Sequence, residues 1–262
     1  MSERVNSLAR GLAVLRSFTG SNRHQTLAEV ARSADLPRAT ARRMLLTLVD
    51  EGLVAVNSGV FELTAGILQL GFGYLSSLTL TEIATPHLET LSARVGNSSS
   101  VAVLDGTDIV YVARVRARRI MNTSIGLGSR FPAYQTSMGR AILADRTEDE
   151  IADIYERSDR SLETEYTVTN FDQLIARISE ARANGYALVD QELAIGLRSI
   201  SAPLRNGRGE TLAAVNVSTE PHLISVDELE TDYVPALLDT AQAIAEGLIA
   251  HESVGLRPGV AS

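Results

Sequence analysis

Three arginines and a threonine stand close together near the N-terminus and carry side chains that can read DNA bases. Arg38, Arg42 and Arg43 end in guanidinium forks, which can bridge O6 and N7 of guanine. Thr40 can bond to a phosphate or contact a thymine methyl group, and Ala39 lies between them. The chemistry that this grouping favours is contact with the major groove of DNA.

Two short helices and a hairpin are the elements that would hold these side chains. Thr26 and Glu29 have the spacing of a capping box and predict the start of one helix. Pro37 predicts the start of the next, which is expected to end at Gly52. The segment 53–63 alternates weakly around a central turn, which indicates a two-stranded wing. Together these patterns predict a winged helix-turn-helix over residues 1–64.

Helical spacing of apolar residues predicts which faces of these helices are buried. In the first helix, 8–18, and in the helix after Pro37, the inward residues are expected to be Leu8, Leu12, Leu15, Phe18, Ala41, Met44, Leu45 and Leu48. The arginines and Thr40 are expected on the faces that this stripe leaves free. The full set of expected DNA contacts is Arg38, Ala39, Thr40, Arg42, Arg43, Thr26, Arg10, Asn57 and Ser58. The alternative is a three-helix packing domain whose arginine face is only solvated.

Charge is distributed unevenly along a chain whose formal net charge is −8. Residues 1–64 hold eight arginines and six acidic residues, whereas the remainder is strongly acidic. A small basic module on an acidic body is typical of DNA binding by one end of a protein. There is no cysteine, which excludes disulfides, a thiolate nucleophile and cysteine metal sites. With no apolar run typical of a signal peptide near the N-terminus, a cytoplasmic location is expected.

The longest uncharged stretch, 63–81, follows the wing. Its glycines, serines and threonines make it a poor membrane span, and no membrane association is expected. We expect a linker helix over 65–80 that pairs with a second copy of the chain, giving a homodimer or tetramer. The alternative is a helix that packs inside its own subunit.

Residues 81–252 alternate helical and strand periods and predict an α+β domain with a mostly antiparallel sheet. The expected helices are 81–95, 136–144, 148–157, 171–183 and 226–250, and the expected strands are 101–104, 109–115, 119–125, 187–190, 198–204 and 211–218. The segment 126–132 is expected to be a loop, and 253–262 a flexible tail.

Polar side chains recur at alternate positions of two predicted strands. Asn216 and Ser218 share one face of their strand, and Ser199 and Ser201 repeat the pattern on the preceding one. Polar groups on an otherwise apolar sheet need hydrogen-bond partners, which a small ligand can supply. The alternative is that they bond to neighbouring backbone or buried water. Ser137 and Met138 begin a helix, whose free N–H groups suit a carboxylate.

Residues that could perform catalysis are isolated. Asp190 and Glu192 could form a carboxylate pair, but Arg198 offers a salt-bridge partner and makes a structural ion pair at least as good an interpretation. The four histidines lack metal-ligand spacing, and neither Gly71-Phe-Gly73 nor Gly126-Leu-Gly128 has the context of a dinucleotide loop. No catalytic residue, metal or cofactor is therefore expected. The competing classes are a metabolic enzyme and a non-DNA-binding sensor with a helical interaction domain.

Four segments together resemble the IclR family of bacterial regulators. They are 8–15, 36–48, Glu51-Gly-Leu-Val54 and 185–203, in that order. The resemblance covers essentially the whole chain. It implies a winged helix-turn-helix joined to a GAF-like effector-binding domain, with operator DNA and a small effector as partners and assembly as dimers or tetramers.

A narrower resemblance is to family members that control protocatechuate and β-ketoadipate catabolism. It rests on 118–121, 130–134, 136–140 and 188–193. The chain departs from the general family pattern at Val189, where many members have an acid, and at Arg205, where an aromatic residue is usual. The resemblance implies a small organic acid as ligand. The expected effector contacts are Ser137, Met138, Ser199, Asn216 and Ser218, with Asp190 nearby from its place in the sequence.

Overall fold

The computed structural model describes residues 5–19, 21–67, 70, 79–117 and 125–255. The chain divides into two compact units, residues 1–77 and 78–262. Most of the predicted linker helix, 65–80, lies outside the described residues, and so does the predicted tail from 256 onward. The two units are considered separately.

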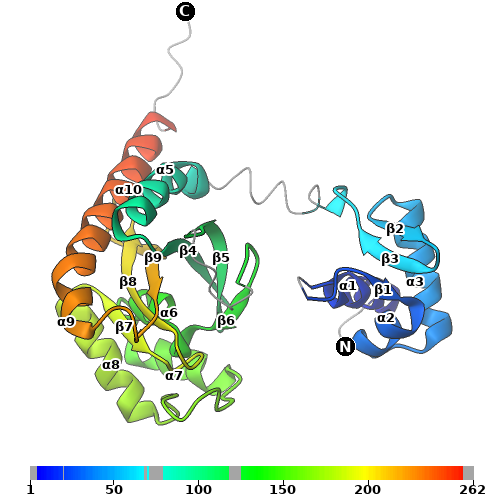
Figure 1. Cartoon of the computed structure of the whole chain (residues 1–262), viewed down its shortest axis with the longest axis horizontal. Coiled ribbons are helices and arrows are strands. Elements are labelled where there is room, and N and C mark those ends of the chain that lie inside the picture. Colours follow the sequence, from blue (N-terminus) through cyan, green and yellow to red (C-terminus); the bar gives the residue numbers. More distant parts are fainter. Residues whose placement is uncertain (1–4, 20, 68–69, 71–78, 118–124, 256–262) are drawn as a thin grey trace, which may run out of the picture. The chain divides into compact units, whose positions relative to one another are not determined.

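The first unit contains a helix-turn-helix and a small sheet (Figure 1). Its helices are α1 (Asn6–Ser17), α2 (Leu27–Ser33) and α3 (Arg38–Asp50). Thr26 caps α2 through the predicted capping box with Glu29. Pro37, predicted at the start of α3, is its N-cap, and the first helical residue is Arg38. The helix-turn-helix is thus confirmed.

The predicted wing is a hairpin of β2 (Val54–Asn57) and β3 (Val60–Leu63). Asn57 pairs with Val60, which leaves Ser58 and Gly59 as a two-residue turn. Both have positive φ, 51° and 81°, the backbone of a tight hairpin turn. A third strand, β1 (Gln25–Thr26), pairs with β3 and was not predicted, because two residues carry no periodicity.

The core of the first unit corrects one part of the predicted packing. Val14, Val30, Leu45, Leu48, Val54 and Phe61 are among its buried residues. Leu8 and Leu12, predicted to face inward, are 63% and 40% exposed. Leu15 and Phe18 do pack in this core beside Val14, so the predicted stripe of α1 is confirmed at its C-terminal end and wrong at Leu8 and Leu12.

The second unit is built on a six-stranded sheet in the order β6-β5-β4-β9-β8-β7, with every neighbouring pair antiparallel. The strands are β4 (Ser98–Asp105), β5 (Asp108–Val115), β6 (Arg130–Pro132), β7 (Ala187–Asp190), β8 (Arg198–Arg205) and β9 (Thr211–Thr219). This arrangement confirms the predicted α+β class.

Helices cover both faces of this sheet (Figure 1). One face packs against α5 (Thr79–Val95) and α10 (Val234–Gly255), with Leu88, Ile200, Val217 and Leu237 in the shared core. The other packs against α6 (Ser137–Leu143), α7 (Glu148–Arg157) and α8 (Phe171–Asn184). Because strand side chains alternate between faces, each strand contributes to both cores.

One strand of the sheet differs from prediction. Strand β6 lies in the segment 126–132, which was predicted to be a loop because its glycines and proline hid a three-residue edge strand. The predicted strand 119–125 lies outside the described residues except for Ile125.

The predicted single C-terminal helix is interrupted. It consists of α9 (Val226–Glu228), a π-helical turn η2 (Leu229–Tyr233) and α10. Val234 donates its N–H to the carbonyl of Leu229, five residues back, and Pro235 follows with no N–H to donate. The missing donor explains the wider turn.

Candidate DNA-binding face and effector cavity

The outward face of α3 carries the predicted arginines. Arg38, Ala39, Arg42 and Arg43 are all exposed. Within the part of the chain that the structure describes, the three guanidinium groups form no ion pair, so they are available to phosphates or base edges. α3 is the second helix of the helix-turn-helix, the position from which such a motif enters the major groove.

Thr40 does not belong to this face. Its side chain is buried, with 8% of the residue exposed. Thr40, Met44 and Leu48 follow one another at intervals of four, so they form one row on the helix and point into the core together. The prediction that Thr40 lies free of the core stripe is therefore wrong.

The weaker candidates lie at the surface in different settings. Arg10 is exposed on α1, and Asn57 and Ser58 are exposed at the tip of the wing. The Thr26 hydroxyl accepts a hydrogen bond from the Glu29 N–H and donates to its carboxylate at 2.8 Å. Its polar group is thus already used in capping α2.

In the second unit, the predicted polar residues come together on the face of the sheet that α6 covers. Register places Ser199 beside Ser218 and Ser201 beside Asn216. The row continues into β4, where Ser100 is the partner of Asn216. We call Ser199, Ser201, Ser218, Asn216 and Ser100 the polar row.

Hydrogen bonds tie the polar row to α6. The Ser137 hydroxyl lies 2.8 Å from that of Ser199 and 2.7 Å from that of Ser201. The Asn216 amide nitrogen donates to Ser218 at 2.9 Å, whereas its carbonyl oxygen Oδ1 is buried with no partner among the described residues. The serines therefore satisfy one another, and Asn216 keeps one acceptor free.

Arg114 on β5 extends the row and was missed by the sequence reasoning. It is the register partner of Ser100 and donates from Nη1 to the Ser100 hydroxyl at 3.1 Å. Its Nε is buried and has no partner within the described chain. Burial lowers the pKa of Arg114, because desolvation disfavours the charged guanidinium. An arginine alternating with apolar residues along a strand was the signal for it.

A narrow cavity lies against the polar row. Its volume is about 20 Å³, room for one water-sized group. It is lined by the predicted Ser137, Met138, Ser199, Asn216 and Ser218, together with Tyr111, Ile125, Gln135, Thr136, Val189, Leu193 and Leu197. Burial raises the pKa of Tyr111 to about 12, which keeps its phenol neutral. We call this space the inner cavity.

A larger outer cavity of about 310 Å³ adjoins the inner one. The two share Ile125, Gln135, Leu193 and Leu197 in their walls. Phe131, Pro132 and Ala194 make most of the remaining wall apolar. Together the cavities offer a small polar end and a wider apolar end. Phe131 and Pro132 belong to the short edge strand β6, and Leu193, Ala194 and Leu197 belong to the loop after β7, where the sequence has no strand period to mark them.

Asp190 does not join this site. It alternates with Val189 on β7, so when Val189 faces the inner cavity Asp190 points to the other face of the sheet. There its Oδ2 accepts from Arg198 at 2.7 Å. The structural ion pair between Asp190 and Arg198 is confirmed, and Asp190 lines neither the inner nor the outer cavity.

The first turn of α6 is partly capped within the structure. The helix has seven residues, and the Thr136 side chain accepts the N–H of Gly139 at 3.1 Å. That donor is therefore already used. What α6 contributes to the inner cavity is the side chains of Ser137 and Met138.

Among the described residues, no three or more His, Cys, Asp or Glu side chains gather where they could hold a metal ion. Nor does any helix in those ranges have the length and apolar character needed to cross a membrane.

Comparisons with known proteins identify both units of the chain. The IclR helix-turn-helix domain matches residues 7–58, and the bacterial transcriptional regulator IclR C-terminal domain matches residues 72–246. The chain is 38% identical to the Pca regulon regulatory protein of Pseudomonas putida over 245 residues, which covers 93% of this chain and 84% of that protein.

Solved structures give the same result. A transcriptional regulator of Rhodococcus sp. RHA1 is 52% identical, with a TM-score of 0.83 and coverage of 95% of this chain and 100% of the other. The inducer-binding domain of the PobR transcription factor of Acinetobacter, a double mutant in complex with 3-hydroxybenzoic acid, is 27% identical with a TM-score of 0.59. The match covers 63% of this chain and 97% of the PobR domain.

An exposed arginine face on a helix-turn-helix, an antiparallel sheet with a ligand-sized cavity, and family matches over both units lead to one assignment. The chain is a DNA-binding transcriptional regulator and belongs to the IclR family, with Pca-type and Pob-type regulators among its relatives.

Proposed function

We propose that this regulator senses a small aromatic acid of the hydroxybenzoate class, bound across the inner and outer cavities of its second unit. The observation that carries the proposal is a pair of buried polar atoms without partners in the described chain, Asn216 Oδ1 and Arg114 Nε, on the same register row. Buried polar atoms are normally satisfied, and a ligand would satisfy these. Their chemistry is one acceptor and one charged donor.

The two atoms suit different groups of the same ligand. A carboxylate would accept from Arg114 and relieve the desolvation of its guanidinium, because an opposite charge favours the charged form. A hydroxyl group would donate to Asn216 Oδ1. An aromatic ring would lie between Met138, Val189 and Leu197 and extend into the outer cavity. The inner cavity must widen to admit a ring and to reach Arg114, which is not among the residues that line either cavity.

Relatives support this ligand class. One relative is named for the Pca regulon, and a second, 29% identical over 92% of this chain, is a p-hydroxybenzoate hydroxylase transcriptional activator from Acinetobacter baylyi. The PobR domain was solved with 3-hydroxybenzoic acid. By extension, we propose an aromatic acid as the signal for this chain.

We further propose that the protein binds its ligand without converting it and that it acts on DNA as a homodimer or a tetramer. Two copies of α3 would read two half-sites of a palindromic operator, separated by about 34 Å, one turn of DNA. The segment 65–80, apolar and uncharged in sequence, would join the copies. Light scattering of Leu75→Asp with Leu78→Asp tests this interface, because a folded variant that stays dimeric would refute it.

Calorimetric titration tests the ligand class. Wild-type protein is titrated with 4-hydroxybenzoate, 3-hydroxybenzoate, protocatechuate and β-ketoadipate, and the ligand is recovered to check that it is unchanged. We expect an aromatic acid to bind, and Asn216→Leu or Arg114→Met to weaken it by about 2 kcal/mol, roughly thirty-fold, through loss of one hydrogen bond to a charged or buried group.

The double variant Ser199→Leu with Asn216→Leu fills the inner cavity and should abolish binding. Asn184→Leu is the matched control, because Asn184 is exposed at the end of α8 and touches neither cavity wall of the proposed site. Retained binding in a folded double variant would place the ligand elsewhere. Binding of β-ketoadipate alone would replace the aromatic class by a keto-dicarboxylate.

A further inference from the structure

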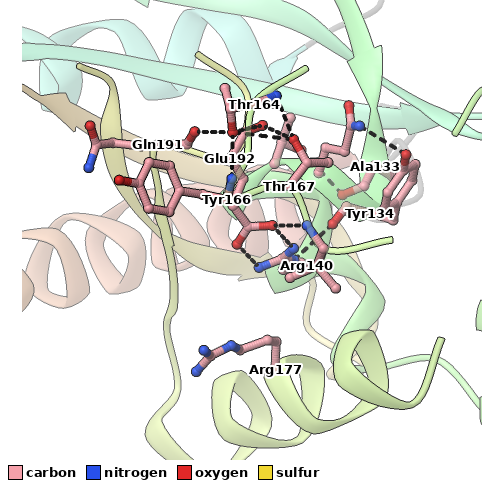
Figure 2. A network of polar contacts seen from close by, with 12 residues as sticks. Ala133, Tyr134, Arg140, Thr164, Tyr166, Thr167, Arg177, Gln191 and Glu192 are labelled. Atoms are coloured by element: carbon pink, nitrogen blue, oxygen red, sulfur yellow. Dashed lines mark hydrogen bonds and ion pairs between the residues drawn. The ribbon is translucent and has the colours of Figure 1, made fainter. Parts of the chain in front are cut away.

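A buried ion pair lies outside the walls of the inner and outer cavities. Arg140 on α6 and Glu192, just after β7, have side chains that are 1% and 9% exposed. The guanidinium donates from Nη1 and Nη2 to the two carboxylate oxygens at 2.7 and 2.6 Å, and Figure 2 shows this two-pronged contact. Paired hydrogen bonds of this kind fix orientation as well as distance.

Each partner of the pair is held by further hydrogen bonds. Arg140 Nε donates to the carbonyl of Tyr134 at 2.8 Å, which ties it to the turn before α6. The Glu192 carboxylate accepts the N–H of Val168 at 3.1 Å, and the backbone carbonyl of Glu192 accepts from the Thr167 hydroxyl at 2.7 Å. Figure 2 shows these bonds converging on Glu192 from the 164–168 segment. Neither charged group can shift without breaking several contacts.

Glu192 belongs to a tight loop, residues 191–197. Gln191 has φ of 60°, and its N–H donates to the carbonyl of Leu197 at 2.7 Å, which closes the loop. Its side chain oxygen accepts from the N–H of Gly196 at 3.2 Å. Positive φ is uncommon for glutamine and persists only where the surroundings hold it. The loop is therefore a small rigid unit anchored at Glu192.

The ion pair connects two walls of the proposed effector site. Ser137 and Met138, which line the inner cavity, precede Arg140 by three and two residues on α6. Leu193 and Leu197, which follow Glu192 in the loop, line both the inner and the outer cavity. The pair thus joins α6 to a loop that contributes to the walls of both cavities.

Stability alone does not account for such a pair. Removing two charges from water costs several kcal/mol per ion, and well-packed apolar replacements are often as stable. What a bidentate pair provides that an apolar pair does not is one defined distance between its two elements.

We infer that Arg140 and Glu192 are positioning residues for effector binding: the pair fixes the 191–197 loop against α6 and thereby sets how tightly an aromatic acid is held. The inference rests on the proposed function for its ligand. If the loop takes its binding position only a tenth of the time, the apparent affinity falls about tenfold.

The main test is Glu192→Asp, which keeps both charges but shortens one arm by a methylene group, so the loop and α6 cannot keep both the pair and their spacing. In the free protein, we expect backbone amides of 191–197 to exchange hydrogen about tenfold faster. For 4-hydroxybenzoate, the calorimetric Kd should rise about tenfold. A role limited to charge balance would change neither quantity.

A second variant tests the same inference if Glu192→Asp does not fold. Arg140→Met with Glu192→Met removes both charges together and leaves no buried ion unpaired. We expect it to fold while showing the same faster loop exchange and weaker binding. Glu180→Gln is the control, because it breaks an exposed pair with Arg177 at 3.0 Å, on α8. It should behave as wild type.

The outcomes separate the two proposals. Unchanged exchange of the loop amides in a folded variant overturns the positioning role, and so does unchanged affinity where exchange is faster. If wild-type protein gives no heat with any hydroxybenzoate, the proposed ligand class fails, whereas the exchange measurement still decides whether the pair positions the loop.

Discussion

The exposed face of α3 and the polar row of the sheet both present hydrogen-bonding groups, but they hold them in opposite ways. On α3, Arg38, Arg42 and Arg43 extend into solvent, where DNA phosphates and base edges can reach them directly. In the polar row, the hydroxyls of Ser199 and Ser201 are each hydrogen-bonded to the Ser137 hydroxyl of α6. Recognition on α3 needs only a surface, whereas recognition at the polar row needs a cavity built from several elements.

This difference has an energetic consequence. A substitution on the exposed face changes one contact with the partner and leaves the domain intact. A substitution around the cavity changes the packing that creates the site, because protein interiors are close-packed. The two regions should therefore respond differently to mutation, and the following experiments test that contrast.

The largest effect is expected at Gly139, in the first turn of α6. An added Cβ would lie 2.0 Å from the carbonyl oxygen of Ala133, which is backbone and cannot turn away. Gly139→Ala should destabilise the second unit by about 3 kcal/mol through overpacking and displace α6 from the polar row. Urea unfolding measures the loss. Gly126→Ala is the control, since no atom of the described residues lies within 4 Å of a Cβ there. Equal stability of the two variants would show that α6 tolerates an added methyl group at Gly139.

A smaller effect, confined to DNA, is expected on α3. Arg42→Ala should weaken operator binding by about 1–3 kcal/mol and relax the preference at one base pair, with no change in folding. Fluorescence anisotropy at two salt concentrations measures it. Thr40→Val is the matched comparison on the same helix: because Thr40 is buried, this variant should keep wild-type operator affinity. A larger loss for Thr40→Val than for Arg42→Ala would reverse the assignment of faces.

The smallest effect concerns the capping boxes at Thr26 with Glu29 in the first unit and at Thr147 with Glu150 in the second. The backbone N–H of Thr26, and then its hydroxyl, hydrogen-bond to the Glu29 carboxylate and lower its pKa below the usual 4.5. A lowered pKa in the folded state means that this stabilisation is present above pH 4.5 and is lost as the pH falls through the lowered value.

Glu29→Gln should therefore flatten the acid side of the stability profile of the first unit slightly, and Glu150→Gln that of the second. Thermal unfolding of both variants is measured between about pH 3 and 6, because ordinary carboxyl groups titrate in roughly this range. Glu89→Gln, exposed in α5, should keep the wild-type slope. A steeper slope in Glu29→Gln would contradict the direction of the pKa shift.

The sequence by itself determined the elements whose signals are local. The capping box at Thr26 and Glu29, the exposed arginines at the start of α3, and the alternation that puts Asn216 and Ser218 on one face all depend on residues a few positions apart. Such signals reflect helix and strand periods, which need no knowledge of the fold. They were enough to predict the helix-turn-helix, the α+β class and the polar positions of two strands, whereas the five expected contacts that line the inner cavity were named from the family resemblance.

Only the tertiary structure decided which neighbours meet across the fold. Thr40 is buried because its row on α3 packs into the core, and Asp190 faces away because Val189 takes the cavity side of β7. The partnership of Arg140 with Glu192 joins residues 52 positions apart, and that of Arg114 with the polar row depends on strand register. Long-range contacts of this kind leave no periodic trace in a sequence, because each is fixed by the packing of whole elements and not by the spacing of residues along one of them.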